Sequence, residues 1–248
     1  MKQIIPIFLA FTLISTTSCS AKKQKQARDI QAVDIIAQLD KGKNIYLDSC
    51  IIWGDLDFTK LRNQNKIAPG LMQIFVNASV TFNNCVFIGK VKTFEANPNV
   101  NVMFERNLSF VNCDFRSDVD FTEIVVRGNA YFTGSVFRAK VSLQGAYFWH
   151  KKVFFNQVNF EGDALFQNTV FAGDVNFLHS VFSSSAMFQK ARVGGMMFFG
   201  NVKFNDYVDF SYSRATESIF MYAEFKGRHD FSYSDINPNG LPDTIINK

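Results

Sequence analysis

The sequence predicts an all-β solenoid, a β-helix with four sides whose N-terminal end carries a short capping helix. A large apolar residue, usually one of the 29 phenylalanines among 248 residues, recurs at alternating steps of five and six residues. The pattern therefore repeats every 11 residues, as expected of a stacked repeat architecture. From residue 110 onward, the large positions are Phe110, Phe115, Phe121, Val126, Phe132, Phe137, Leu143, Phe148, Phe155, Phe160, Phe166, Phe171, Phe177, Phe182, Phe188, Val193, Phe199, Phe204, Phe210, Ala215, Phe220, Phe225, Phe231 and Ile236.

A small or β-branched residue stands two positions before most of these large residues. Positions two apart on an extended strand share a face, so each short strand points one small and one large residue inward. Four such sides close a coil of about 22 residues, and coils stack at roughly 4.8 Å through backbone hydrogen bonds. We therefore expect rings to stack down the axis. The small inward residues include Val119, Ala130, Ser135, Val141, Ala146, Ala164, Thr169, Val175, Ser180, Ala186, Ala191, Val202 and Val208.

Glycine stands at many of the predicted corners, often with Asp or Asn after it. Such glycines suit a positive φ, and the acidic residues beside them fit turn chemistry. Their spacing matches no glycine–aspartate calcium repeat. The corner glycines are Gly54, Gly89, Gly128, Gly162, Gly173 and Gly227.

Copies of the repeat unit also occur earlier in the chain. The segment 47–58 aligns with 110–121, and 82–92 is a third copy. This pattern resembles the pentapeptide-repeat family, in particular its Phe-rich variant with five- and six-residue steps. The resemblance covers about 47–236 and implies a right-handed quadrilateral β-helix, which we place at residues 43–236.

The chain departs from the family pattern at a few places. Two irregular stretches, near 59–79 and 95–107, are expected to be loops that leave one side of the array. One extra residue enters at 149–152, and Ala215 is a weak step in the large positions.

The N-terminus predicts a targeting segment. Residues 1–18 combine a lysine with a short apolar run, as in a signal peptide, and the run is too short to span a membrane. The small residues before Cys19 resemble a bacterial lipobox, although Thr16 replaces the usual leucine. Cys19 is therefore the expected lipidation site, with 19–28 as a polar tether. The alternative is cleavage after Ala21, which would give a soluble periplasmic protein.

The two ends of the array are predicted to differ. Residues 29–42 show a helical apolar period, with Asp29 as N-cap and Gly42 as stop, and we expect this capping helix to cover the first coil. The array ends at Ile236 without such a helix, so a homodimer through the C-terminal coil is a further expectation. Residues 237–248 break the pattern and form a tail.

Three cysteines occupy the same inward slot of the repeat. Cys50, Cys85 and Cys113 predict a stacked column of small core thiols. Neighbouring coils would bring their Cα atoms within disulfide range, so one disulfide is an alternative in an oxidising periplasm. Their spacing does not fit metal ligation, and we predict no metal and no cofactor.

Catalytic motifs are missing from the sequence. His150, His179 and His229 are isolated, and no nucleophile elbow, phosphate loop, dinucleotide fingerprint or zinc-binding helix motif occurs. We therefore expect a protein that is not an enzyme.

Outward positions carry the candidate contact residues. An apolar residue stands just before the large position in several repeats, and a 22-residue coil places Phe154 and Phe198 on one face, two coils apart. An exposed aromatic face is a candidate contact surface. Tyr222 belongs to a run of outward tyrosines near the C-terminus. The predicted contact face consists of Tyr131, Phe154, Leu165, Met187, Phe198, Tyr212 and Tyr233.

These observations favour an envelope lipoprotein whose β-helix serves as a structural or protein-interaction scaffold, anchored to a membrane by its lipid. The alternative is a carbohydrate-binding envelope module that uses the tyrosines and Trp149. A third reading follows from the family, some members of which resemble a DNA duplex and act on topoisomerases. That role needs an acidic surface, whereas this chain has a net charge of +4 and an export signal. We expect no nucleic-acid partner.

Overall fold

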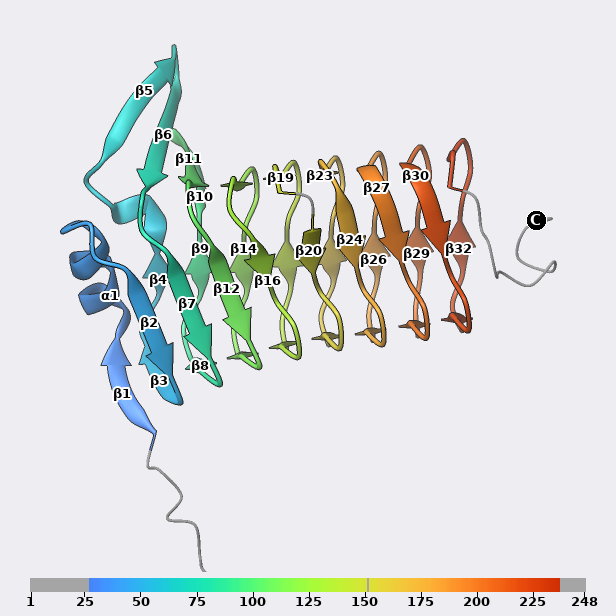
Figure 1. The fold of residues 1–248 in the computed structure, drawn as a ribbon, viewed down its shortest axis with the longest axis horizontal. Helices are drawn as coiled ribbons and strands as arrows, with labels where there is room; N and C mark the ends of the chain where they lie inside the picture. Colours follow the sequence, from blue (N-terminus) through green and yellow to red (C-terminus); the bar gives the residue numbers. More distant parts are fainter. Residues whose placement is uncertain (1–26, 151, 237–248) are drawn as a thin grey trace, which may run out of the picture.

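The computed structural model describes residues 27–150 and 152–236 as an elongated stack of coils (Figure 1). The predicted signal peptide 1–18, Cys19, most of the tether and the tail 237–248 lie outside the described residues. Within the described part, no helix has the length and apolar character needed to cross a membrane.

Parallel strands line four sides of the stack, and each strand pairs with its equivalents in the coils before and after it. The first face contains β2 (Ile45–Asp48), β7 (Val80–Asn83), β12 (Leu108–Val111), β16 (Ala130–Tyr131), β20 (Lys152–Phe154), β24 (Asp174–Asn176) and the ends of β27 (Arg192–Phe198) and β30 (Arg214–Ile219). The second face contains β1 (Arg28–Gln31), β3 (Cys50–Trp53), β8 (Val86–Phe87), β13 (Asp114–Phe115), β17 (Val136–Phe137), β21 (Asn159–Phe160), β25 (Val181–Phe182), β28 (Lys203–Phe204) and β31 (Glu224–Phe225).

The remaining two faces complete each coil, and the fourth face joins the first through β27. The third face contains β4 (Leu56–Asp57), β9 (Val91–Lys92), β14 (Val119–Asp120), β18 (Val141–Ser142), β22 (Ala164–Leu165), β26 (Ala186–Met187), β29 (Val208–Asp209) and β32 (His229–Asp230). The fourth face contains β6 (Leu71–Val76), β11 (Asn99–Phe104), β15 (Val125–Val126), β19 (Tyr147–Phe148), β23 (Val170–Phe171) and the starts of β27 and β30. The predicted four-sided β-helix is confirmed.

The register between coils follows the sequence rhythm. Phe115 lies opposite Phe137, 22 residues later, as the repeat requires. Phe137 lies opposite Phe160, one residue further, because the insertion at 149–152 falls between them. Phe204 lies opposite Phe225, one residue nearer, which absorbs the shortened step after Ala215. The coil length thus varies locally while the inward columns stay aligned.

Aromatic rings fill the core in two orientations. Along the axis, Phe115 stacks on Phe137 with centroids 4.6 Å apart and planes 1° apart, and Phe132 stacks on Phe155 in the same way at 4.6 Å and 2°. Across the axis, rings meet edge to face, as Phe166 and Phe177 do at 5.4 Å and 90°. Both arrangements suit the ring quadrupole. All the predicted small inward residues are buried beside them.

The N-terminal cap is shorter than predicted. The helix α1 spans Ala32–Leu39 and buries Ala32, Ile35, Ile36 and Leu39 over the first coil. Asp29 is not its N-cap, because residues 28–31 form the parallel strand β1 beside β3, where the carboxylate accepts a 2.7 Å hydrogen bond from Trp53 Nε1.

The two predicted loops are largely strands. The stretch 59–79 contains a short 3-10 helix η1 (Phe58–Lys60) and an antiparallel hairpin of β5 (Gln64–Ala68) with β6. In the second stretch, β10 (Phe94–Ala96) pairs with β11 in the same way. Figure 1 shows the β5–β6 hairpin projecting from the N-terminal end of the stack. The parallel β6–β11 pairing explains the projection, since it extends the fourth face beyond one coil side.

Most predicted corner glycines are required for a different reason. Gly54 has a φ of +79°, but Gly89, Gly128, Gly162 and Gly227 do not have a positive φ. A Cβ at Gly128 would lie 2.3 Å from the carbonyl carbon of Arg106 in the preceding coil, so the close approach of backbones excludes a side chain. The left-handed conformation falls instead at alternate corners, and its residues include Asn84, Asn112, Asn168, Lys190, Tyr212, Tyr222 and Tyr233.

Removing one core ring should destabilise the stack strongly. Phe166 is fully buried, stacks on Phe188 at 4.8 Å and meets Phe177 edge-on. Phe166→Ala leaves a cavity, and we expect it to lower the free energy of unfolding by about 3–5 kcal/mol in equilibrium urea denaturation. Ser183→Ala, an exposed position on the same stack, should change it by less than about 0.5 kcal/mol. Equal losses in both variants would contradict the packing described.

Candidate interaction surfaces

Groups suited to catalysis or metal binding do not converge in the described residues. No set of three His, Cys, Asp or Glu side chains there could hold a metal ion. His179 lies at the corner between the first and second faces, whereas His229 lies in an inward slot of the third face. The candidate sites on the described residues are therefore surfaces that could contact a partner molecule.

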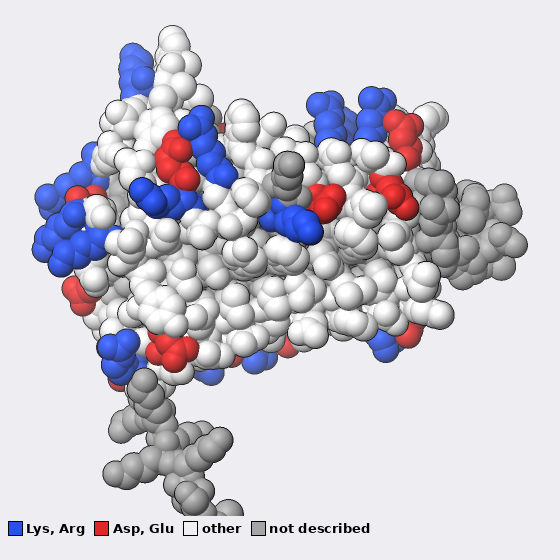
Figure 2. Space-filling view, viewed as in Figure 1, with Lys and Arg blue, Asp and Glu red and all other residues white. Residues whose placement is uncertain are grey.

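The first face carries no charged side chain along its outward column from β7 to β30. Two pairs of residues illustrate the register between coils: Tyr131 lies opposite Phe154, and Asn176 lies opposite Phe198. Figure 2 shows this face as a broad area without Lys, Arg, Asp or Glu, with charges gathered along its upper and lower edges. The residues of this column, which we call the uncharged column, are Thr81, Ser109, Tyr131, Phe154, Asn176, Phe198 and Ile219.

The aromatic residues of the uncharged column are half-buried. Tyr131 stacks on Phe154 with centroids 5.4 Å apart and planes 3° apart. Between Phe154 and Phe198 a cleft of about 180 Å³ opens over Asn176, with Lys152 and Asp174 at its rim. The cleft gives the face one concave position.

The predicted contact face does not form a single surface. Tyr131, Phe154 and Phe198 share the first face, but Leu165 and Met187 lie opposite each other on β22 and β26 of the third face. An 11-residue step is half a coil, so it carries a residue to the opposite side.

The tyrosines are divided for the same reason. Tyr212 and Tyr233 stand on the corner between the third and fourth faces, where their rings stack at 4.9 Å and 16°. Tyr222 lies on the diagonally opposite corner, between the first and second faces. Sequence reasoning did not identify Lys190, Arg192 and Arg214, which surround the Tyr212–Tyr233 pair.

The three inward cysteines form the expected core column. Cys50, Cys85 and Cys113 are buried, free, and aligned on β3 and on the turns before β8 and β13. Burial raises the pKa of Cys113, and the neighbouring Cys113 thiol lowers the pKa of Cys85 to about 7. Arg28 Nη2 donates to Cys50 Sγ at 3.5 Å. The column is a core element with no access from solvent.

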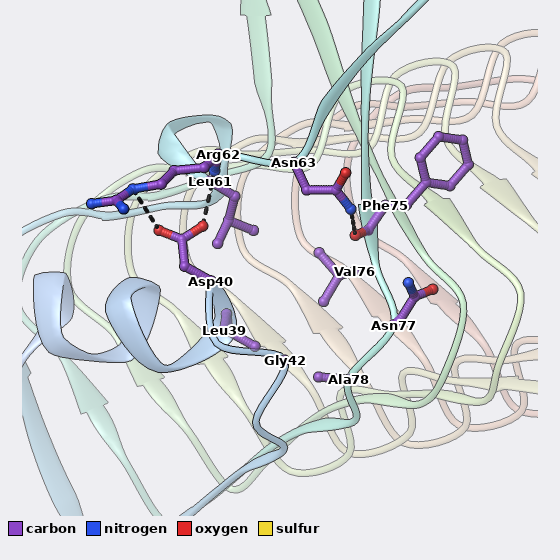
Figure 3. Close-up of a pocket in the computed structure, with 10 residues that line it drawn as sticks. All are labelled: Leu39, Asp40, Gly42, Leu61, Arg62, Asn63, Phe75, Val76, Asn77 and Ala78. Atoms are coloured by element: carbon purple, nitrogen blue, oxygen red, sulfur yellow. Dashed lines mark hydrogen bonds and ion pairs between the residues drawn. The ribbon is translucent and has the colours of Figure 1, made fainter.

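A pocket of about 410 Å³ lies between the end of α1 and the base of the β5–β6 hairpin (Figure 3). Several of its polar groups already bond within the protein. Asp40 Oδ1 accepts from the backbone N–H of Arg62 at 2.9 Å, and Asn63 Nδ2 donates to the carbonyl of Phe75 at 3.1 Å. Leu61 and Val76 line the hollow beside them. The pocket therefore lies where the cap and the hairpin are joined by hydrogen bonds.

Comparison with known families places this fold. Residues 155–198, from the end of β20 to the end of β27, match the family model of pentapeptide repeats (9 copies). This segment therefore carries pentapeptide repeats, as the sequence pattern indicated. No curated protein matches the chain.

Proposed function

We propose that this protein is a non-enzymatic scaffold of the bacterial cell envelope that presents its first face to a partner protein. The observation that carries the proposal is the uncharged column, which runs over successive strands while the other faces carry charges such as Asp114, Asp120 and Arg192. The centres of protein interfaces are depleted in charge and enriched in aromatic residues.

Rigidity supports the scaffold role. Every strand of the first face is hydrogen-bonded to its neighbours, so outward side chains are held at one strand spacing. From β7 to the end of β30 the uncharged column extends over about 29 Å, which suits a partner of similar size. Binding costs little conformational entropy when the side chains of the surface are already held in place.

A lipid on Cys19 would attach the stack at its capped end. Strand β1 begins at Arg28, so fewer than ten residues separate the anchor from the first coil. Because the anchor would lie at one end of the stack, the first face, which runs along its side, would remain open to a partner. The net charge of +4 and the uncharged column both argue against a DNA mimic.

The contact face can be tested by paired substitutions on opposite sides. We expect Phe154→Ser/Phe198→Ser to bind the partner from an envelope extract at least about tenfold more weakly than the wild type. Interface anchors of this kind contribute more than about 1.4 kcal/mol to the binding free energy. Leu165→Ser/Met187→Ser makes the same change in the same slot of the third face and should retain the partner. The proposal fails if both variants capture the wild-type amount, with folding checked by circular dichroism.

The anchor is tested separately by metabolic labelling with radioactive palmitate. Wild-type protein should incorporate label and sediment with membranes, whereas Cys19→Ala should do neither, because the thiol is the acylation site. Label retained in Cys19→Ala would place the acyl chain on another residue and reject Cys19 as the site. Label absent from the wild type would leave the soluble periplasmic alternative.

A further inference from the structure

Positive side chains gather around the exposed tyrosine pair at the C-terminal part of the stack. Lys190 precedes Tyr212 and Tyr233 in one corner column, and Arg192 and Arg214 form the neighbouring column of the fourth face. Figure 2 shows basic side chains at the upper edge over the starts of β27 and β30. We call these five residues the basic corner.

The charges of the basic corner are only partly balanced. Arg192 and Arg214 lie directly opposite each other on neighbouring strands, where like charges repel. Arg214 pairs with Asp235 at 3.1 Å. In the part of the chain that the structure describes, Arg192 and Lys190 make no ion pair. The corner therefore retains positive charge that an anion would neutralise.

Tyr212 and Tyr233 occupy a corner position whose backbone suits smaller residues better. Tyr212 and Tyr233 have φ values of 57° and 56°, a left-handed conformation that glycine and asparagine tolerate best. Earlier coils place Gly145 and Asn168 at this corner position. The two residues are 51% and 78% exposed. The pair therefore presents two stacked, exposed rings at a corner where the earlier coils carry no aromatic residue.

Two hollows flank the arginines. Lys190, Arg192, Tyr212, Arg214 and Tyr233 line a cavity of about 240 Å³. A second hollow of about 590 Å³ lies beside it on the fourth face, and its lining includes Arg192 and Arg214 together with the small residues Ala172, Gly194 and Thr216. The guanidinium groups therefore stand between two open spaces, where their donors can meet a ligand.

We propose that the basic corner binds an acidic carbohydrate. An apolar face of a sugar ring would pack on the Tyr212–Tyr233 pair, since one side of a pyranose presents C–H groups to an aromatic ring. Arg192 and Lys190 would donate hydrogen bonds to a carboxylate or phosphate on the sugar, and the planar guanidinium fits either anion in bidentate fashion.

The extent of the corner favours this ligand over a nucleic acid. Its cations occupy two neighbouring coils, about 5 Å apart, and one of them is already paired. The preceding positions of the same corner column are Glu123, Gly145 and Asn168, which offer no cation to a longer phosphate backbone. One or two anionic groups match the site. The corner does not border the first face, so this inference stands apart from the proposed scaffold function.

Titration calorimetry on the full chain tests the site with probes that differ in charge. Tetragalacturonate and glucose 6-phosphate supply a carboxylate and a phosphate on a sugar, fully methyl-esterified tetragalacturonate removes the charge, and oligothymidylate supplies phosphates without a pyranose. We expect at least one acidic sugar to bind, with at least about tenfold weaker binding of its uncharged counterpart, methyl-esterified tetragalacturonate or glucose. Binding should weaken as salt is raised, because exposed charges are screened.

Substitutions can borrow residues from earlier coils, which protects the fold. Arg192→Val installs the residue found at Val170, and Tyr212→Asn installs the residue found at Asn168; each should raise Kd about tenfold. Tyr222→Asn makes the same change at the diagonally opposite corner, where the tyrosine is 74% exposed, and should leave Kd unchanged.

Several results would overturn the proposal. Failure of both acidic sugars to bind would do so, as would equal binding of the acidic and uncharged sugars. Unchanged affinity in Arg192→Val and Tyr212→Asn would show that these residues do not bind the sugar. Oligothymidylate binding more tightly than either sugar, with loss in both variants, would assign the corner to single-stranded nucleic acid and reject the carbohydrate.

Discussion

Backbone hydrogen bonds between neighbouring coils hold the inward side chains one strand spacing apart, and the rest of the structure depends on that register. At this spacing a flat ring meets the ring of the next coil in van der Waals contact, as Phe160 and Phe182 do at 4.6 Å. The register also satisfies buried hydroxyls, because Ser135 Oγ accepts from Cys113 N–H at 3.0 Å and donates to the carbonyl of Phe110 at 2.9 Å. The same closeness leaves no room for a Cβ at Gly162.

That register also organises the outer surface, since each outward residue lies beside its equivalent in the next coil. Like side chains therefore accumulate in columns: uncharged residues along the first face, and Arg192 beside Arg214 on the fourth. A change at one repeat position alters one column and leaves the opposite face untouched. Two separate surfaces, the first face and the basic corner, can then coexist on one rigid core.

The inward half of the chain was predictable because its chemistry repeats. The extra residue between Phe148 and Phe155 was visible in the sequence, and the structure absorbs it in the corner before β20. The corner glycines were located correctly, but a positive φ explains only Gly54 among those described above, since a single sequence does not reveal which backbone lies beside Gly128. The hairpin of β5 and β6 was missed because its strands lack the phenylalanine rhythm and pair antiparallel. On the surface, the coil length correctly placed Phe154 and Phe198 on one face. The faces of Leu165, Met187 and Tyr222 could be predicted only by assigning each repeat to one side of the coil. Arg192 and Arg214 gave no sequence signal beyond their spacing of 22.

The coil length is the central claim, and a single distance tests it most directly. Arg116 and Lys226 are exposed and lie in one corner column, five strand spacings apart. Nitroxide labels attached there through unnatural ketone residues, which spare the native cysteines, can be measured by double electron–electron resonance. The structure predicts a backbone separation of about 24 Å, broadened by the label arms. A separation near 48 Å, roughly double, would mean that each coil uses 11 residues and would contradict the four-sided stack.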